Sequence, residues 1–386
     1  MHIERLYAEH FRNLELLEWW PNRHFNLIVG DNGQGKSNLL EAIAVAASLR
    51  SFRTSQLRDC LRFDTEEATL GLRIVRRALS TDLGLRLHRG QKKLFVDGKA
   101  ATTMAQYLGR LVVVLFSTAD LQLPHAEPAD RRRWLDRLAF NHEPQHLTDL
   151  RRFEHTLANR NALLRQNRSA PIDGDLLAAY DEVLARSGIA ILQRRQRVLA
   201  RLGPILDDVF ARIAAPGLRA TALYAPRDAI ASEQALRDLY TSHRSRDLVR
   251  GFTTRGPHRD DVALGIGDRP AALHASQGQC RALVLALKIA EIRSLEADFG
   301  EPPVLLMDDI SSELDASRNR ALMAYLDELG GQVFLTTTDA AHIRVAAPRQ
   351  VFAMRAGTIH ETAHFARATA ADVGNPQPAA AAPGVP

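Results

Sequence analysis

The chain has 386 residues, 46% apolar and 25% charged, a composition typical of an ordinary globular protein. Its length exceeds that at which a single core usually stops growing, so two or three lobes are expected. It has no run of about eighteen apolar residues and no basic N-terminal segment followed by an apolar run, which argues against a membrane span and a secretory signal. The two cysteines, Cys60 and Cys280, lack metal-ligand spacing and favour a reduced, cytoplasmic location.

The formal net charge of +5 is unevenly distributed along the chain. Residues 131–201 contain fourteen Arg, no Lys and eight acids, which gives +6 and leaves the rest of the chain at −1. A local basic excess is the electrostatic footprint of a polyanion binder. Charge alone, however, favours a simpler interpretation, a solvated helical face.

The first 129 residues predict strands with one helix. Residues 1–29 predict strands that end in the apolar run 25–29, and residues 36–50, rich in Leu, Ala and Ile, predict a helix. Residues 68–97 contain three short alternating segments separated by turn residues, which predicts a β-meander. Residues 111–116 predict another buried strand.

Residues 130–213 are dominated by Arg, Leu and Ala, with apolar residues at helical spacing. A Pro- and Gly-containing stretch, 169–175, divides two apolar stripes, which predicts a hairpin of two antiparallel helices. Helices of about twenty-five residues would reach about 35–40 Å. An ordinary helical subdomain explains the pattern at least as well as a coiled coil. The stripes are Leu150, Phe153, Leu157 and Leu164, then Tyr180, Leu184, Ile191, Val198, Leu202 and Ile205.

The C-terminal part alternates strands and helices, which predicts a parallel α/β sheet. The expected elements are strands at 218–224 and 262–266, a helix at 279–297, a strand at 304–307, a helix at 315–329 and a strand at 333–336. From residue 366 the sequence is rich in Ala and Pro and predicts a disordered tail.

The strongest motif matches a phosphate-binding loop and comprises Gly30, Asp31, Asn32, Gly33, Gln34, Gly35, Lys36 and Ser37. It follows an apolar strand and opens a helix, the context that this motif requires. Glycines let backbone N–H groups point at phosphate oxygens, and the helix N-terminus adds partial positive charge. Lys36 is expected to reach the β- and γ-phosphates of ATP, and the Ser37 hydroxyl to ligate Mg²⁺.

An acidic pair, Asp308 and Asp309, follows the apolar strand 304–307. Sites in parallel sheets lie at the carboxyl ends of the strands. We expect Asp308 to hold Mg²⁺, directly or through water, and Asp309 to orient or deprotonate the attacking water. The predicted catalytic residues are therefore Asp309 and Lys36.

A polar turn precedes the long helix at 279–297 and comprises Ser276, Gln277, Gly278 and Gln279. A turn at a helix N-terminus can bind an anion, although, taken alone, this turn is better explained as a plain helix cap. The Ser-Ser-Glu-Leu-Asp stretch at 311–315 follows the acidic pair. In this order, the motifs resemble the head of an ATP-binding-cassette ATPase. In that class the serine–glycine turn completes the ATP site of a second subunit, so the resemblance implies an ATP-gated homodimer.

The motifs predict an α/β fold: a cassette-type head with a mixed sheet and an inserted helical hairpin lobe. We expect residues 1–129 to form the N-terminal part of the head with the phosphate loop, and 130–250 to form the helical arm lobe. Residues 251–365 would complete the head with the serine–glycine turn and acidic strand, and 366–386 would be the tail.

The chain resembles the RecF family of SMC-like ATPases over nearly its whole length to about residue 360. Matching stretches are 6, 11–13, 26–38, 131–136, 159–164, 256–261, 276–279 and 308–315. The resemblance implies a protein that binds ATP and DNA and dimerises on ATP. It also implies a place at single-strand to double-strand junctions of gaps, where partners RecO and RecR help load the RecA recombinase, with SOS induction as a consequence.

Two positions bear on hydrolysis. Residues 116–121 read Phe-Ser-Thr-Ala-Asp-Leu where the family commonly has Phe-Ser-Pro-Glu-Asp-Leu, so this stretch lacks the Pro and Glu of a segment that the resemblance would connect with γ-phosphate sensing. Asp309 is one methylene shorter than the Glu of many related ATPases. We therefore expect a weak, DNA-stimulated ATPase that acts as a switch.

Three other functions compete with DNA repair. A transporter ATPase shares the head pattern, but here the insert is an Arg-rich hairpin and the turn reads Ser-Gln-Gly-Gln. An anti-phage ATPase with an attached nuclease would need a further acidic domain, for which the tail leaves no room. A scaffold that binds ATP without hydrolysing it is distinguished by replacing Lys36 and Asp309 separately.

Overall fold

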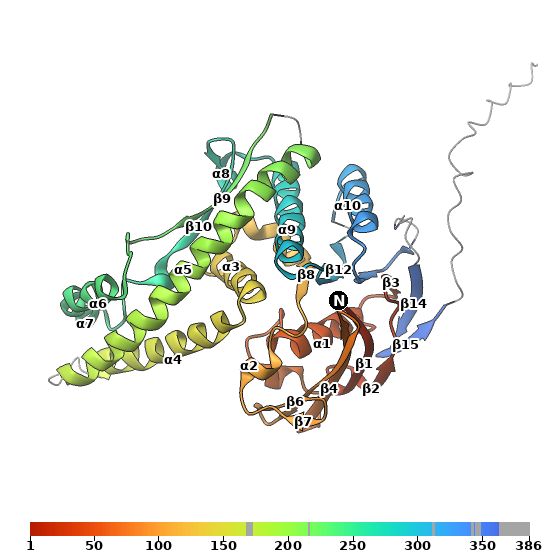
Figure 1. The fold of residues 1–386 in the computed structure, drawn as a ribbon, viewed down its shortest axis with the longest axis horizontal. Coiled ribbons are helices and arrows are strands. Elements are labelled where there is room, and N and C mark those ends of the chain that lie inside the picture. Colours follow the sequence, from red (N-terminus) through yellow and green to blue (C-terminus); the bar gives the residue numbers. More distant parts are fainter. Residues whose placement is uncertain (167–172, 215–216, 311–312, 341–342, 344–348, 363–386) are drawn as a thin grey trace, which may run out of the picture.

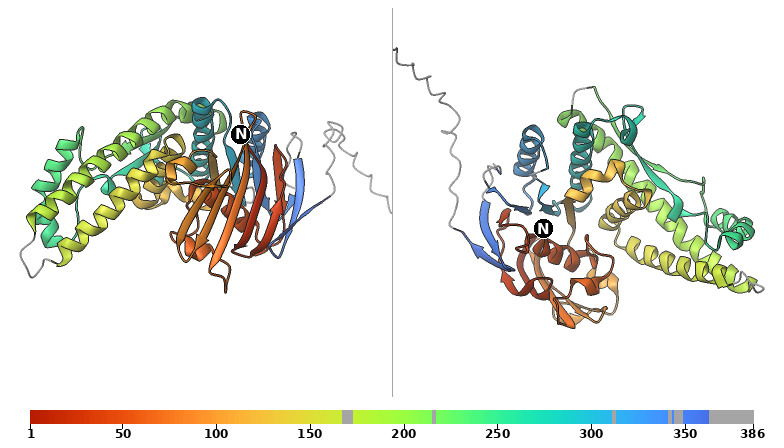
Figure 2. Two further views of the ribbon diagram at one scale, coloured as in Figure 1. Left: turned by 60° about the horizontal axis from the view of Figure 1, so that its bottom comes forward. Right: turned by 180° about the vertical axis from the view of Figure 1, so that it is seen from behind.

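The fold is α/β, with a head built around two sheets and a helical arm that projects from it (Figures 1 and 2). The computed structural model describes residues 1–362 except 167–172, 215–216, 311–312, 341–342 and 344–348. The expected tail at 366–386 therefore lies outside the described residues. Within the described part of the chain, no helix has the length and apolarity needed to cross a bilayer.

The first sheet of the head is antiparallel throughout, in the spatial order β2-β1-β4-β5-β6-β7. It consists of β2 (Leu14–Trp19), β1 (His2–Phe11), β4 (Glu67–Arg76), β5 (Leu79–His88), β6 (Gln91–Val96) and β7 (Lys99–Ala100). Alternate residues of β4 are buried, as expected for a sheet with one covered face. They are Ala68, Leu70, Leu72 and Ile74. The β-meander predicted over 68–97 is confirmed.

The second sheet is mixed, with five parallel strands and one antiparallel edge strand, in the order β15-β14-β3-β13-β12-β8. Its strands are β15 (Thr358–Glu361), β14 (Arg349–Arg355), β3 (Phe25–Val29), β13 (Val333–Thr337), β12 (Val304–Asp308) and β8 (Val113–Ser117). In the strand β12, Val304, Leu305, Leu306 and Met307 are all buried, so this strand is apolar on both faces, as expected in a parallel sheet. The predicted parallel sheet is confirmed for the strands at 304–307 and 333–336. For the predicted strands at 218–224 and 262–266 it is wrong, because they pair antiparallel with each other in a separate sheet.

Helices cover both faces of this second sheet. On one face, α1 (Lys36–Ser48) packs between the two sheets, where it shares a core with Val304 and Leu306 of β12. On the other face, α9 (Gln277–Phe299) and α10 (Ala316–Leu329) share a core with Leu305 and Met307. Shorter segments are η1 (Leu57–Cys60), α2 (Met104–Tyr107), η2 (Thr118–His125) and α8 (Ala271–His274).

The arm is built from α3 (Pro128–His142), α4 (Gln145–Gln166) and α5 (Gly174–Ile213). The last two are the expected antiparallel pair. Of their predicted connection over 169–175, residues 169–172 lie outside the described residues, and α5 already begins at Gly174. The predicted length of α5 is wrong: it has 40 residues, or about 60 Å at the helical rise. Although Pro204 interrupts its pattern, the helix continues because Leu206, Val209 and Phe210 are buried in the core shared with the head.

A third, three-stranded sheet packs along α5, in the order β11-β10-β9. It consists of β11 (Arg269–Pro270), β10 (Asp261–Ile266) and β9 (Ala220–Ala225), with α6 (Glu233–Ser242), α7 (Arg244–Arg250) and η3 (Pro257–Arg259) between β9 and β10. Strand β9 belongs to the expected arm lobe and β10 to the expected C-terminal head part. The proposed limits of these domains stay a prediction.

Candidate nucleotide-binding site

Glycines shape the loop between β3 and α1 because other residues would clash or strain there. Gly33 and Gly35 have positive φ angles of 80° and 109°. A Cβ on Gly35 would lie 2.7 Å from Asn13 Oδ1, and one on Gly30 would lie 2.5 Å from the backbone oxygen of Met354. The loop therefore turns as a phosphate loop must, with its backbone free to approach a ligand closely.

Two neighbouring turns brace this loop through Gln34. The Gln34 carbonyl accepts hydrogen bonds from Asn13 Nδ2 at 3.2 Å and from the Gly357 N–H at 2.9 Å. Its side-chain Oε1 accepts from the Ala356 N–H at 2.7 Å. The β1–β2 and β14–β15 turns thus hold the loop in place. Sequence reasoning missed both, because they are distant in the chain.

Lys36 lies at the first position of α1 and is only 7% exposed. Its ammonium donates to the carbonyl oxygens of Gly30 at 2.5 Å and Asp31 at 2.9 Å. Burial lowers the pKa of Lys36, an effect that the nearby negative charges of Asp309 and Asp308 oppose. The structure therefore brings the predicted lysine and the predicted acidic pair into one electrostatic site.

The predicted metal ligands lie next to each other. Ser37 Oγ donates to Asp308 Oδ1 at 2.8 Å, although the two residues come from α1 and β12. The Thr336 hydroxyl, at the end of β13, donates to the same carboxylate oxygen at 2.9 Å. Hydroxyl and carboxylate oxygens are hard donors of the kind that Mg²⁺ prefers, so the residues present fit this ion.

Asp309 follows β12 in a left-handed conformation, with φ of 52°. A non-glycine residue rarely adopts this conformation, and such strain clusters at functional sites. The Asp309 N–H donates to Thr336 Oγ1 at 3.1 Å. Thr336 thus fixes both acids, and sequence reasoning missed it. The signal that could have found it is its place at the carboxyl end of the neighbouring parallel strand.

The serine–glycine turn begins α9 as a reciprocal helix cap. Ser276 Oγ accepts from the Gln279 N–H at 3.2 Å, and Gln279 Oε1 accepts from the Ser276 N–H at 2.9 Å. Ser276 and Gln277 are exposed, and a Cβ on Gly278 would lie 3.1 Å from Arg318 Nη2. Over the described residues, no hydrogen bond or ion pair joins this turn to the phosphate loop.

The stretch after the acidic pair turns toward α9. Ser311 and Ser312 lie outside the described residues. Asp315 caps α10 by accepting from the backbone N–H groups of Ser317 and Arg318, both at 3.1 Å. Glu313 lies 3.9 Å from Arg281 in α9. The segment from the acidic pair is therefore linked to the helix that carries the serine–glycine turn.

The stretch at 116–121 joins the site through its first residues. Ser117 pairs with Asp308 in the register of β8 and β12. Asp120 is buried, accepts from the Ser117 N–H at 2.8 Å and from Arg137 at 2.8 Å, and forms an ion pair with Lys288 at 3.2 Å. Burial alone would raise the pKa of Asp120, but the Lys288 and Arg137 charges hold it well below its usual range.

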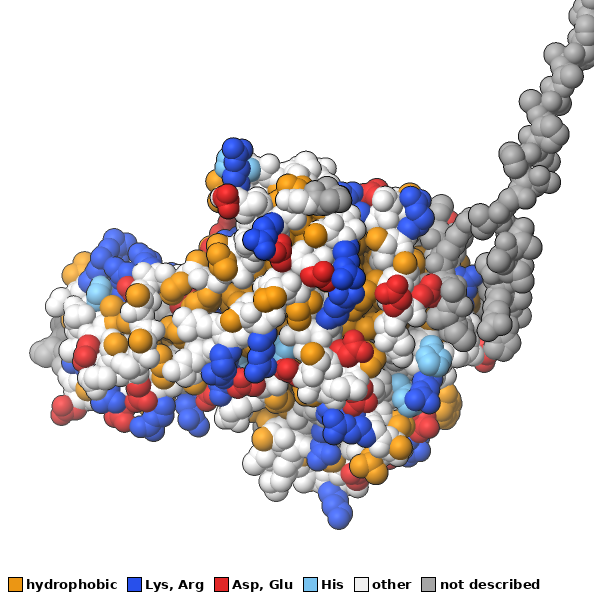
Figure 3. Space-filling model, turned by 45° about the horizontal axis from the view of Figure 1, so that its top comes forward, with side chains coloured by type: hydrophobic (Ala, Val, Ile, Leu, Met, Phe, Trp, Pro, Cys, Tyr) orange, Lys and Arg blue, Asp and Glu red, His pale blue; other side chains and the backbone are white. Residues whose placement is uncertain are grey.

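Most arginines of residues 131–201 are already neutralised within the protein. Among the residues that the structure describes, which exclude Arg168, nine of the fourteen form ion pairs with carboxylates. On the face shown in Figure 3, positive and negative side chains are interspersed along the arm. The net charge of +6 therefore overstates the positive charge that this segment offers to a polyanion. The nine are Arg131, Arg133, Arg137, Arg160, Arg186, Arg194, Arg195, Arg197 and Arg201.

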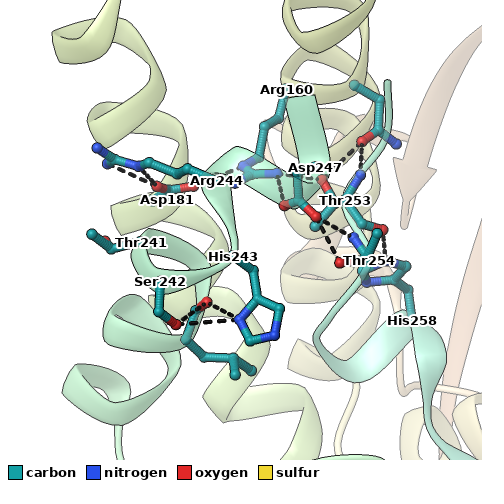
Figure 4. A network of polar contacts seen from close by, with 12 residues as sticks. Arg160, Asp181, Thr241, Ser242, His243, Arg244, Asp247, Thr253, Thr254 and His258 are labelled. Carbon is teal, nitrogen blue, oxygen red and sulfur yellow. Dashed lines mark hydrogen bonds and ion pairs between the residues drawn. The ribbon is translucent and has the colours of Figure 1, made fainter. Parts of the chain in front are cut away.

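A buried network shows what these arginines do instead. Arg160 is fully buried and donates to Asp181 at 2.7 Å, to Asp247 at 2.8 Å and to Thr253 Oγ1 at 2.8 Å (Figure 4). Arg244 also donates to Asp181, at 2.9 Å. The network joins α4, α5 and α7 at the outer part of the arm. Such charges are stabilising only as a complete set.

The loop, the acidic strand end and the capped turn on α9, arranged around this sheet order, define a P-loop ATPase head of the ATP-binding-cassette type. The model of the RecF/RecN/SMC N-terminal domain family matches residues 2–360. With the relatives described next, this match shows that the chain belongs to the RecF family.

The relatives cover nearly the whole chain. The DNA replication and repair protein RecF of Myxococcus xanthus is 41% identical, over 90% of this chain and 93% of that protein. RecF of Geobacter sp. strain M21 is 37% identical, over 89% and 95%. The solved structure of the recombination mediator RecF–ATPrS of the RecFOR pathway aligns with a TM-score of 0.85 and 30% identity, over 94% of this chain and 98% of that one. The Pyrococcus furiosus Smc head shares the fold alone, at 15% identity and a TM-score of 0.51.

Proposed function

We propose that this chain is an ATP-dependent DNA-binding protein of recombinational repair and replication restart. ATP and Mg²⁺ are the proposed cofactors, and the cytoplasm is the proposed location. The observation that carries the proposal is the hydrogen bond from Ser37 to Asp308, which brings the loop and the acidic strand together while Ser276 stays exposed elsewhere. A relative of this chain has been solved as RecF–ATP, which supports the choice of nucleotide.

In the proposed reaction, Lys36 leaves the loop carbonyls to contact the β- and γ-phosphates. Ser37 and Asp308 would hold Mg²⁺, which offsets phosphate charge when bound. Asp309, fixed by Thr336, orients or accepts a proton from the attacking water. Because the Asp309 side chain is short, hydrolysis is slow and the protein acts as a switch that DNA stimulates.

ATP would close two copies of the chain into a dimer. The serine–glycine turn is exposed and shares no bond with its own phosphate loop among the described residues, so its proposed ligand is the ATP of a second copy. Leu273 lies three residues before Ser276 and is 77% exposed. An exposed apolar side chain beside a polar turn suits a protein interface.

The DNA function rests on the relatives. Proteins of this family are named for DNA replication and repair, and one solved relative for the RecFOR pathway. For this chain we propose binding to gapped DNA at single-strand to double-strand junctions. We further propose that the protein works with RecO and RecR to load RecA, and that it supports SOS induction.

Size-exclusion chromatography of the Asp309→Asn variant tests the switch. With ATP we expect a dimer that persists, more so with gapped DNA, because binding is retained while hydrolysis is blocked. Lys36→Ala should stay monomeric, because losing the charged contacts to phosphate removes about 3 kcal/mol or more of ATP affinity. Lys99→Ala, at an exposed lysine of β7, is the matched control. A protein that stays monomeric with saturating ATP in the Asp309→Asn background contradicts the proposal.

A further inference from the structure

We propose that Arg50, Lys92 and Arg151 together form a phosphate-binding site for the backbone of duplex DNA, at the junction of the head and the arm. This inference rests on the DNA binding proposed above and says which cations make the contact. It differs from the expectation from net charge, because two of the three residues lie outside the Arg-rich segment 131–201.

The three cations come from three different elements of the fold. Arg50 follows the end of α1, the helix that carries the phosphate loop at its other end; Lys92 lies in β6, and Arg151 in α4. The Arg151 guanidinium donates to the sulfur of Met104, the first residue of α2, and α2 packs against β6. Figure 1 shows α2 beside the head end of α4. The site therefore bridges the head and the arm.

Within the described part of the chain, these cations lack the partners that neutralise the arginines of the arm. None of the three forms an ion pair among the described residues, whereas nine arginines of 131–201 do. Partial loss of hydration and the positive charges of Arg151 and Arg50 lower the pKa of Lys92 to about 8. Glu154, one turn further along α4, acts on Arg50 and Arg151 without pairing with either. The cluster is thus a site of net repulsion, which bound phosphate would relieve.

A duplex backbone fits this cluster better than single-stranded DNA. Single strands are held largely by stacking of bases on exposed aromatic rings. The aromatic residues next to the cations in sequence are not free to stack, because Phe153 is buried and Phe52 packs against the head core. The Phe95 ring is covered by the Arg86 guanidinium, which lies 5.9 Å from its centroid. Cations on rigid elements without stacking rings suit phosphate contacts that read no sequence.

The triple variant Arg50→Gln/Lys92→Gln/Arg151→Gln tests the assignment. Fluorescence anisotropy with a labelled blunt duplex, titrated over about 50 to 200 mM salt, gives the slope of log K against log salt. Each cation that no longer neutralises a phosphate should flatten this slope by about one, so a decrease of about two to three is expected. The control Arg58→Gln/Arg212→Gln/Arg219→Gln removes the same charge from side chains that are 69%, 67% and 79% exposed.

Thermal unfolding separates a binding role from a structural one. Removing like charges should leave the triple variant as stable as the parent or more so, while its duplex affinity falls. If it unfolds instead, the single Lys92→Gln variant, at a surface lysine, should still flatten the slope by about one. An unchanged slope in a parent protein that binds duplex overturns the site and leaves the proposed function standing. A loss confined to single-stranded DNA also overturns it, and a parent that binds no DNA removes the proposed function as well.

Discussion

The phosphate loop and the arginine-rich arm both present positive charge, but the protein uses that charge in opposite ways. In the loop, Lys36 is held beside Asp308 and Asp309 by a contiguous motif whose glycines set the backbone. In the arm, arginines such as Arg160 and Arg195 form ion pairs with buried carboxylates. A site that is defined by its backbone can therefore be identified from a short stretch of sequence. The charge that the arm offers to a partner instead depends on which side chains form ion pairs in the folded protein.

The largest expected effect comes from breaking the buried network of the arm. Arg160→Ala should lower the free energy of unfolding by about 3–5 kcal/mol, because Asp181 and Asp247 lose their buried partner. Urea unfolding followed by circular dichroism measures this change. Arg212→Ala, which removes an exposed pair with Asp208, should change it by about 0.5 kcal/mol or less. Similar small losses for both variants would mean that the two kinds of pairing do not differ.

A smaller effect is expected in the head. Thr336→Val removes the hydroxyl that donates to Asp308 and accepts from the Asp309 N–H, at a typical cost of about 1–2 kcal/mol. We expect the ATP hydrolysis rate to fall by about tenfold while ATP affinity stays nearly constant, because Lys36 and the loop are untouched. Single-turnover hydrolysis and equilibrium nucleotide binding measure the two quantities. Thr81→Val, at a threonine of β5 remote from the site, serves as the control; a fall in affinity with an unchanged rate would contradict the positioning role.

Sequence reasoning predicted the sheet and the site only where the information is local. Lys36, Ser37, Asp308 and the serine–glycine turn lie in contiguous motifs, and the structure places the first three together. Thr336 was missed because its role depends on which strand lies beside β12. The length of α5 was wrong because the helix extends beyond the predicted apolar stripe at both ends, from Gly174 to Ile213, and its last turns bury Val209 and Phe210 in the core shared with the head. No local pattern reports such packing.

The cluster of Arg50, Lys92 and Arg151 at the head–arm junction should differ from the paired arginines of the arm in how its DNA binding depends on pH. Lys92, with a pKa of about 8, is mostly charged at pH 7 and mostly neutral at pH 9. Loss of hydration and the positive charges of Arg151 and Arg50 disfavour its charged form, and Glu154, which acts on these two arginines, forms no ion pair with either among the described residues. Duplex affinity should therefore fall by up to about tenfold over this range, beyond any change in a Lys92→Arg variant.

The stability of the free protein should change in the opposite direction. The folded-state pKa of Lys92 lies below its ordinary value of 10.5, so the unfolded chain binds more protons between about pH 8 and 10.5, and the Lys92 contribution to stability rises with pH there. Comparing the pH dependence of unfolding for the parent and Lys92→Gln isolates this contribution. If duplex affinity and folding stability changed in the same direction with pH, Lys92 would have a structural role, as the arm arginines do, and would not be a phosphate ligand.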